Sequence, residues 1–221
     1  MPYATLVSDF DGTMAANDFY KLAVEHLLSP KALTPWEDYR AGKLTHFEAL
    51  RIIFSRIRAP ESDMLALVRS MDPDPNLAEC VNALSRERWH VVVASAGCDW
   101  YIRRVLDIAG VPQDCPGGVE VHANPGSYSP ETGLRMDSPM ESEFFSPETG
   151  VDKAAIVRFH QDRGRTTAFA GDGFADLPAA LEVPATLRFA RADLATALSG
   201  MHEPFRPFSR WCDVASALLE V

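Results

Sequence analysis

Three short apolar runs, each ending in a polar turn, divide the chain. They are "YATLVS" at residues 3–8, "HVVVAS" at 90–95 and "TTAFAG" at 166–171. Continuous apolar runs rich in β-branched or small residues are typical of parallel strands buried on both faces. Between the second and third runs, residues 98–110 and 151–164 carry apolar side chains at helical spacing and end in glycine. This alternation predicts an α/β fold, a Rossmann-like doubly wound parallel sheet with helices on both faces.

The stretch from residue 16 to 85 has a different pattern. Its amphipathic segments are separated by prolines, and none of them shows the strand pattern. We therefore expect a helical cap over residues 16–85, inserted into a catalytic core of residues 1–15 and 86–221. An insertion after the first strand would lie over the carboxyl ends of the strands, where ligands bind in such folds.

Residues 112–150 are rich in Pro, Gly and Ser and contain "SPETG" twice, at 129–133 and 146–150. Pro near the start of a turn and Gly at its end is good turn chemistry. We expect both copies to mark the ends of short strands.

Charge and cysteine usage exclude some functions. The net charge of −10 disfavours nucleic acid as a partner, although a metal ion or a lysine can still make one cleft attractive to a small anion. No apolar run is long enough for a membrane helix, and no signal-peptide pattern follows Met1. No CxxC pair is present, so we expect no zinc site. We expect a cytoplasmic protein with free thiols, either a monomer or a homodimer. The four cysteines are Cys80, Cys98, Cys115 and Cys212.

Acidic residues follow two of the predicted strands. Asp9 and Asp11 come after the first strand, and Asp172 and Asp176 come after the third. Like carboxylates at close range repel, and burial penalises each charge. A hard divalent cation removes that cost, and Mg²⁺ suits an all-oxygen site that also binds a phosphate. The four aspartates are expected to converge on one edge of the sheet.

Two further residues point to phosphate chemistry. Ser95 ends the second strand, and Lys153 lies near the start of a predicted helix. A hydroxyl, backbone amides, an ammonium and Mg²⁺ would together bind a phosphoryl group and offset its charge during transfer.

The segments "DFDGT", "VVVAS", Lys153 and "GDGFAD" resemble, in order, the four motifs of the haloacid dehalogenase (HAD) superfamily of phosphatases. The resemblance covers nearly the whole chain and implies a HAD-like fold. It implies that Asp9 is the nucleophile that forms an aspartyl-phosphate. It implies that Asp11 protonates the leaving oxygen and then activates the hydrolytic water.

The same resemblance implies a ligand set for each part of the site. Mg²⁺ would be held by Asp9, the backbone carbonyl of Asp11 and Asp172, while Asp176 supports the waters on the metal. The substrate would be bound by Ser95 with the adjacent amides of Ala96 and Gly97, by Lys153, which also neutralises charge, and by Asp18.

A helical cap after the first motif is similar to the phosphoserine phosphatase-like branch. Within it, the pair Asn17 and Asp18 and the tail at 187–218 resemble the 2-hydroxy-3-keto-5-methylthiopentenyl-1-phosphate phosphatases of methionine salvage. Asp18 replaces the glutamate that contacts the substrate amino group in phosphoserine phosphatases. The second motif reads Ser-Ala-Gly in place of Ser-Gly-Gly. The expected substrate is a small phosphate ester, either this methionine-salvage intermediate or phosphoserine.

Two alternatives remain open: a phosphomutase of the same superfamily, and a phosphate-binding or regulatory protein without turnover. Dehalogenation is disfavoured because dehalogenases lack the second acid, Asp11. In the cap, the aromatic residues at helical spacing are expected to form its own core, and most of the basic residues to face solvent. The aromatic residues are Trp36, Tyr39, Phe47 and Phe54, and the basic ones are Arg40, Lys43, Arg51, Arg56 and Arg58.

Overall fold

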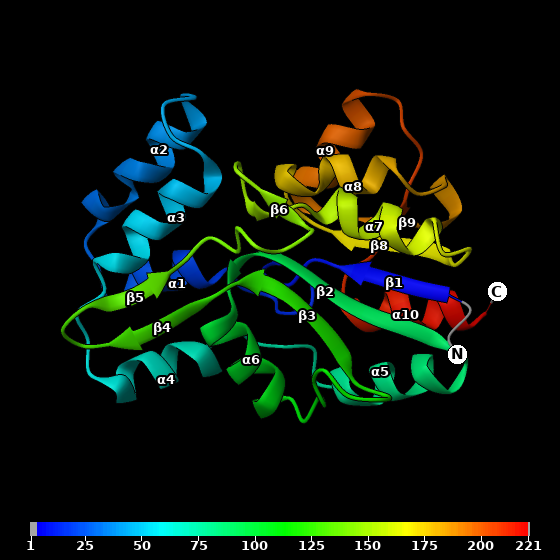
Figure 1. Cartoon of the computed structure of the whole chain (residues 1–221), viewed down its shortest axis with the longest axis horizontal. Helices are drawn as coiled ribbons and strands as arrows, with labels where there is room; N and C mark the ends of the chain where they lie inside the picture. The colour runs from blue at the N-terminus through cyan, green and yellow to red at the C-terminus, as the bar shows by residue number, and fades with distance from the viewer. Residues whose placement is uncertain (1–3, 221) are drawn as a thin grey trace.

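The computed structural model describes residues 4–220 and has a six-stranded, entirely parallel sheet at its centre (Figure 1). The strand order is β10-β9-β8-β1-β2-β3. The strands are β1 (Ala4–Ser8), β2 (Trp89–Cys98), β3 (Val119–Asn124), β8 (Thr166–Gly171), β9 (Arg188–Ala190) and β10 (Arg206–Pro207). The three predicted strands are β1, β2 and β8, which lie side by side at the middle of the sheet. Tyr3, predicted to start the first strand, lies outside the described residues.

Helices cover both faces of the sheet, as the doubly wound prediction required. On one face, apolar side chains of β1, β2 and β8 pack with α7 (Lys153–Gln161), α8 (Leu177–Leu181) and α9 (Ala192–Gly200). On the other face lie α5 (Leu77–Arg86), α6 (Asp99–Ile108) and α10 (Trp211–Leu219). The sheet is therefore buried on both sides, which explains why its central strands read as continuous apolar runs.

The helical insertion after β1 is present. It contains α1 (Phe19–His26), η1 (Pro30–Leu33), α2 (Thr34–Arg40), α3 (His46–Ser55) and α4 (Glu61–Arg69). A capping box at Thr45 and Glu48 begins α3. The last helix of the stretch, α5, packs against β2 and α10 instead. The division into core and cap at residue 85 stays a prediction. Two further 3₁₀ turns, η2 (Phe174–Asp176) and η3 (Ala185–Leu187), lie in the core.

Both copies of "SPETG" form the turns of β-hairpins, as predicted. The first joins β4 (Gly126–Ser129) to β5 (Gly133–Met136), and the second joins β6 (Phe145–Ser146) to β7 (Gly150–Val151). The second turn reaches the start of α3, where the Phe47 amide donates a hydrogen bond of 2.9 Å to the Glu148 carbonyl. The hairpins therefore connect the sheet to the inserted helices.

The expectation of four free thiols is wrong. Cys80 on α5 and Cys212 on α10 form a disulfide, whereas Cys98 and Cys115 are free. The two half-cystines are 132 residues apart in sequence, and only the packing of α5 against α10 brings them together. Because disulfides are rare in cytosolic proteins, this bond also removes the support for a cytoplasmic location. Among residues 4–220, every helix is too short or too polar to span a lipid bilayer.

Candidate active site

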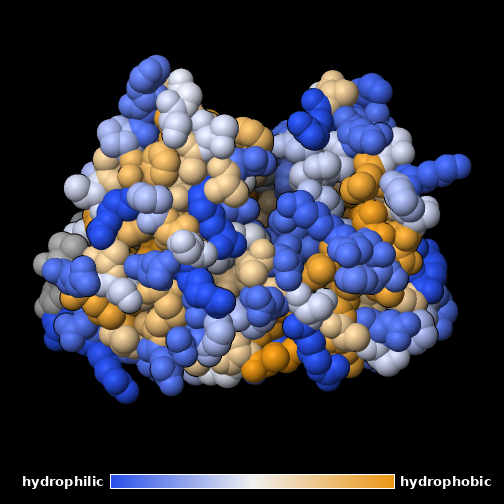
Figure 2. Space-filling view, turned by 180° about the vertical axis from the view of Figure 1, so that it is seen from behind, coloured by the Kyte–Doolittle hydropathy of each residue, from blue (hydrophilic) through white to orange (hydrophobic). Residues whose placement is uncertain are grey.

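A cavity of about 520 Å³ lies at the carboxyl ends of β1, β2 and β8. Its walls come from the catalytic motifs on the sheet side and from α2 and α3 on the other. The space-filling view shows the hollow between the lobe with α2 and α3 and the lobe with α8 and α9 (Figure 2). The predicted motif residues therefore line one cavity.

Lys153 lies between two carboxylates at the base of this cavity. Its Nζ is 2.5 Å from Asp9 Oδ1 and 2.6 Å from Asp176 Oδ1, and all three side chains are at most 9% exposed. Lys153 is the first residue of α7, which is capped by the Asp152 side chain. Burial lowers the pKa of Lys153, but Asp176 and Asp9 outweigh it and raise the pKa above its usual value. The lysine is a fixed cation that holds Asp9 in place.

Asp172 completes the acidic cluster. One carboxylate oxygen from each of Asp9, Asp172 and Asp176 lies within 4.8 Å of the others, close enough to hold one metal ion. The hydroxyl of Thr13 donates to Asp172 Oδ1 at 3.1 Å and to Asp9 Oδ2 at 3.4 Å. The second oxygen of Asp176 accepts from the backbone amides of residues 172 and 173 at 3.0 and 2.9 Å. Hydrogen bonds thus orient every carboxylate of the cluster.

The cluster carries more negative charge than one lysine can offset. Burial, then the Asp176 charge, raises the pKa of Asp9 to about 6, against the opposing effect of Lys153. Burial, then Asp9 and Asp176, raises the pKa of Asp172 to about 9. A divalent cation would favour the ionised forms of these carboxyls, so the donor set fits a hard cation with oxygen ligands.

Asp11 has different neighbours from Asp9. Its Oδ2 accepts a hydrogen bond from the Tyr101 hydroxyl at 2.7 Å, and its Oδ1 accepts from the Phe19 amide at 2.9 Å. Burial, then the Asp18 charge, raises the pKa of Asp11 to about 7. A carboxyl that titrates near neutrality can both give and take a proton, which general acid–base catalysis requires.

Two glycines of the motifs are required by close approach. Gly12 has φ +71°, and a Cβ there would overlap the Asp172 carboxylate. A Cβ at Gly97 would overlap the Tyr101 hydroxyl. Any larger residue at either position would displace an acidic group or its hydrogen-bond donor.

The other predicted site residues also line the cavity. Ser95 is 1% exposed, and its Oγ accepts a 3.0 Å hydrogen bond from the Gly97 amide. Ala96 and Gly97 follow it along the cavity wall. Asp18 lies at the cap side and forms an ion pair with Lys21. Their roles as substrate ligands stay predictions.

Among the aromatic residues of the inserted helices, Phe47 and Phe54 are buried in the core, as predicted, whereas Trp36 and Tyr39 are half-buried. Trp36, Tyr39 and Phe54 line the cavity, while Phe47 is buried elsewhere and does not. Arg40 also faces the cavity, whereas most other basic residues of the insertion do not line it. Amphipathic spacing shows which side of a helix is apolar, but not whether that side meets protein or a cavity.

Several residues that line the site carry no sequence motif. The Nδ1 atom of His46, on α3, is buried without a hydrogen-bond partner among residues 4–220. Burial, then the charge of Lys153, lowers the pKa of His46 to about 4, so this imidazole is neutral. Tyr20, Tyr101 and Asp193 also line the cavity. No spacing rule ties these positions to the motifs, so only the folded structure reveals them.

The C-terminal segment holds the loop after β1 that carries Asp9 and Asp11. The Trp211 indole donates to Ser8 Oγ at 2.9 Å, and Ser8 Oγ donates to the carbonyl of Asp9 at 2.7 Å. Arg191 Nε donates to the Gly12 carbonyl at 2.6 Å. The loop that carries both aspartates is therefore held at both ends.

Comparisons with known proteins agree with this geometry. Residues 6–181 match the model of the haloacid dehalogenase-like hydrolases. A search of curated protein sequences gives no significant match.

Solved structures with the same fold share little sequence. A HAD family hydrolase from Salmonella enterica serovar Typhi has a TM-score of 0.68 at 15% identity, over 94% of this chain and 67% of that one. A substrate-bound phosphoserine phosphatase has a TM-score of 0.61 at 17% identity, over 86% of each chain. Cytosolic 5′-nucleotidase IIIB bound to cytidine has a TM-score of 0.59 at 18% identity, over 99% of this chain and 84% of that one.

The family match covers the central strands β1, β2, β3 and β8, the inserted helices and all four motifs. The chain belongs to the haloacid dehalogenase-like hydrolase family.

Proposed function

We propose that the protein is a Mg²⁺-dependent phosphomonoesterase that forms an aspartyl-phosphate on Asp9. The observation that carries the proposal is the buried arrangement in which Lys153 lies between Asp9 and Asp176, with Asp172 alongside. Asp11, with its pKa near 7, lies in the same cavity. This combination supplies a nucleophile, an acid–base group and charge neutralisation, which are the parts that phosphoryl transfer needs.

The residues fit the proposed metal. Asp9, Asp172 and the backbone carbonyl of Asp11 would hold Mg²⁺, with Asp176 in support. When bound, the ion would offset the charge of the phosphoryl group and of the clustered carboxylates.

The groups of the chain itself account for both chemical steps. Asp9 attacks phosphorus, the bond from phosphorus to the ester oxygen breaks, and protonated Asp11 gives its proton to the leaving alkoxide. In the second step ionised Asp11 takes a proton from water, whose oxygen attacks phosphorus and releases Asp9 with inorganic phosphate. Lys153 holds Asp9 in place and favours its ionised form before the attack on phosphorus.

The cavity favours one of the two expected substrates. The half-buried Trp36 and Tyr39 offer apolar surface opposite the carboxylates, which suits the thioether chain of the methionine-salvage ester. The charge of Asp18 is already offset by Lys21, which weakens its use for the ammonium group of phosphoserine. We therefore propose a small ester with an apolar arm, and no nucleic acid partner.

Phosphate release from a panel of small esters tests this function. The panel contains the methionine-salvage ester, phosphoserine, phosphocholine, sugar phosphates and a generic aryl phosphate, each with Mg²⁺ and with EDTA. We expect Mg²⁺-dependent release, fastest from the methionine-salvage ester. Fastest release from phosphoserine would overturn the substrate, and release from none of the esters would favour a binding protein.

A further inference from the structure

A second cavity, of about 880 Å³, lies at the opposite end of the sheet from the carboxylates. It is lined by the amino ends of β2 and β3, by the last residues of α5 and α7, and by the loop before β3. Along β2, His90 in this cavity and Ser95 in the catalytic one are roughly 16 Å apart. The two cavities are therefore separate, and the mechanism above uses nothing from this one.

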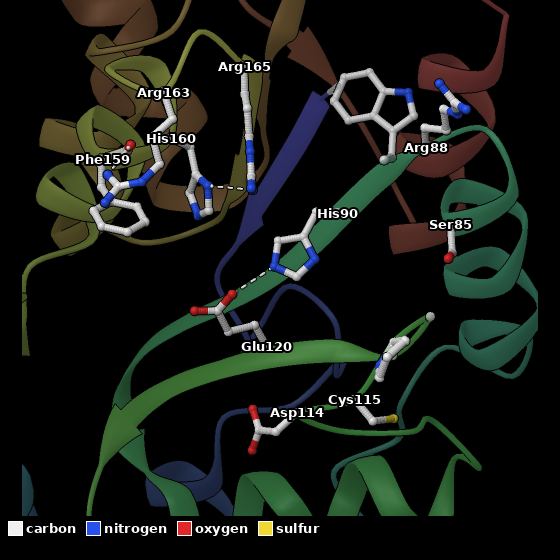
Figure 3. Close-up of a pocket in the computed structure, with 14 residues that line it drawn as sticks. Ser85, Arg88, His90, Asp114, Cys115, Glu120, Phe159, His160, Arg163 and Arg165 are labelled. Carbon is white, nitrogen blue, oxygen red and sulfur yellow. Dashed lines mark hydrogen bonds and ion pairs between the residues drawn. The ribbon is translucent and has the colours of Figure 1, made fainter. Parts of the chain in front are cut away.

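Two arginines on one wall present guanidinium groups. Arg163 lies over the ring of Phe159, with its Cζ 3.3 Å from the ring centroid, and donates to the Phe159 carbonyl. Arg165 donates a 3.1 Å hydrogen bond to His160 Nδ1 (Figure 3). Within residues 4–220, neither arginine forms an ion pair with a carboxylate. Both guanidiniums are held in place with their charge not neutralised.

The acids of this cavity already have partners. Asp114 pairs with Arg103 at 2.7 Å. Glu120 accepts from His122 and His90 at 2.7 Å each, and these hydrogen bonds hold its pKa below the usual range. Figure 3 shows Glu120 joined to His90, between the wall that carries Arg163 and Arg165 and the loop that carries Asp114 and Cys115. The lining of this cavity therefore carries three arginines, Arg88, Arg163 and Arg165, against the two carboxylates of Asp114 and Glu120, in a chain of net charge −10.

The walls also offer flat surfaces for a ring. The stacked pair of Arg163 and Phe159 is one such surface, and the half-buried Trp89 is another. Guanidinium groups complement phosphate oxygens, and aromatic or guanidinium planes stack on bases. The volume lies within the range of pockets that enclose small ligands.

We propose that this cavity binds a phosphorylated ligand with a planar ring, the chemical class of the nucleotides, through Arg163 and Arg165. The phosphate contacts the two guanidiniums, and the ring lies against one of the two flat surfaces of this cavity, Trp89 or the pair of Phe159 and Arg163. The site is distinct from the catalytic cavity and needs no metal ion.

Isothermal titration of the full chain with AMP and with inorganic phosphate, in EDTA to prevent turnover, tests the proposal. We expect AMP to bind more tightly than phosphate. Arg163→Ala and Arg165→Ala should each weaken AMP binding roughly ten- to a hundredfold, because each removes charged hydrogen bonds to phosphate. The matched control Arg135→Ala changes an exposed arginine on β5 and should bind AMP like the wild type.

Each other outcome overturns part or all of the proposal. Equal affinity for AMP and phosphate would exclude a role for the ring. Absence of binding up to millimolar AMP, or binding that both arginine variants retain, would overturn the site. AMP binding that is lost in Asp9→Asn would place the ligand in the catalytic cavity. Circular dichroism of each variant separates loss of binding from loss of folding.

Discussion

Replacing Lys153 by Met removes one charge from the most buried part of the site. The ammonium is 2.5 Å from Asp9 Oδ1 and 2.6 Å from Asp176 Oδ1, and the three side chains are at most 9% exposed. Met is also unbranched and fills a similar volume. The variant therefore leaves two buried carboxylates without their cation and creates almost no void.

The size of the effect follows from that geometry. Removing one partner of a buried ion pair costs roughly 3–5 kcal/mol. For a chain of this size each kcal/mol lowers the melting temperature by roughly 2–4 °C, so the expected fall in EDTA is roughly 6–20 °C. Saturating Mg²⁺ should make the fall smaller, because the bound cation offsets part of the negative charge left on the buried carboxylates.

Thermal unfolding followed by circular dichroism, in EDTA and in Mg²⁺, measures this effect. Lys43→Met is the matched control, because Lys43 forms an exposed ion pair with Asp38, and it should melt within about 2 °C of the wild type. Adding Asp9→Asn to Lys153→Met should restore part of the lost stability. A Lys153→Met protein that melts with the wild type in EDTA would refute the assignment of Lys153 as the buried counter-ion.

Three further predictions use the same structure. In EDTA, the stability of the fold should fall between about pH 5.5 and about pH 8.5, because folding raises the pKa values of Asp11 and Asp172 to about 7 and about 9, and the stabilising protons leave as the pH rises through these values. Thermal melts at the two pH values test this, and a higher melting temperature at pH 8.5 would contradict it. Tyr101→Phe removes a hydrogen bond to ionised Asp11 and should raise its pKa further, so the limb of the pH–rate profile that Asp11 sets moves up by roughly one unit. An unmoved profile would show that Tyr101 does not act through Asp11. Cys80→Ser removes the disulfide to α10 and should lower the free energy of unfolding by roughly 2–5 kcal/mol. Dithiothreitol should lower the melting temperature of the wild type but not that of the variant, and a wild type that melts at the same temperature with and without reductant would oppose this.

The sheet and the motif residues could be predicted because each depends on local sequence. Strands buried on both faces read as continuous apolar runs, and parallel strands bring their following residues to one edge. This is why Asp9, Asp172 and Asp176 meet, and why Lys153 at the start of α7 reaches them. The turns of both hairpins were predictable for the same reason, since Pro and Gly define them locally.

The remaining features depend on how distant segments pack. Tyr101 and His46 reach the cavity from α6 and α3, and no spacing between them and the motifs is fixed. The disulfide between Cys80 and Cys212 requires α5 to lie against α10. Trp36 and Tyr39 line the cavity although their spacing predicts a core position, because an apolar helix face looks the same in sequence whether it meets protein or a cavity.

Asp9 is the proposed nucleophile, and its phosphorylation can be measured directly. The wild type and Asp9→Asn are mixed with an aryl phosphate and Mg²⁺, quenched in acid during turnover and analysed by mass spectrometry of their peptides. We expect one added phosphoryl group on the wild-type peptide that contains Asp9, and neither the adduct nor phosphate release in Asp9→Asn. Phosphate release at the wild-type rate from Asp9→Asn would contradict the covalent mechanism.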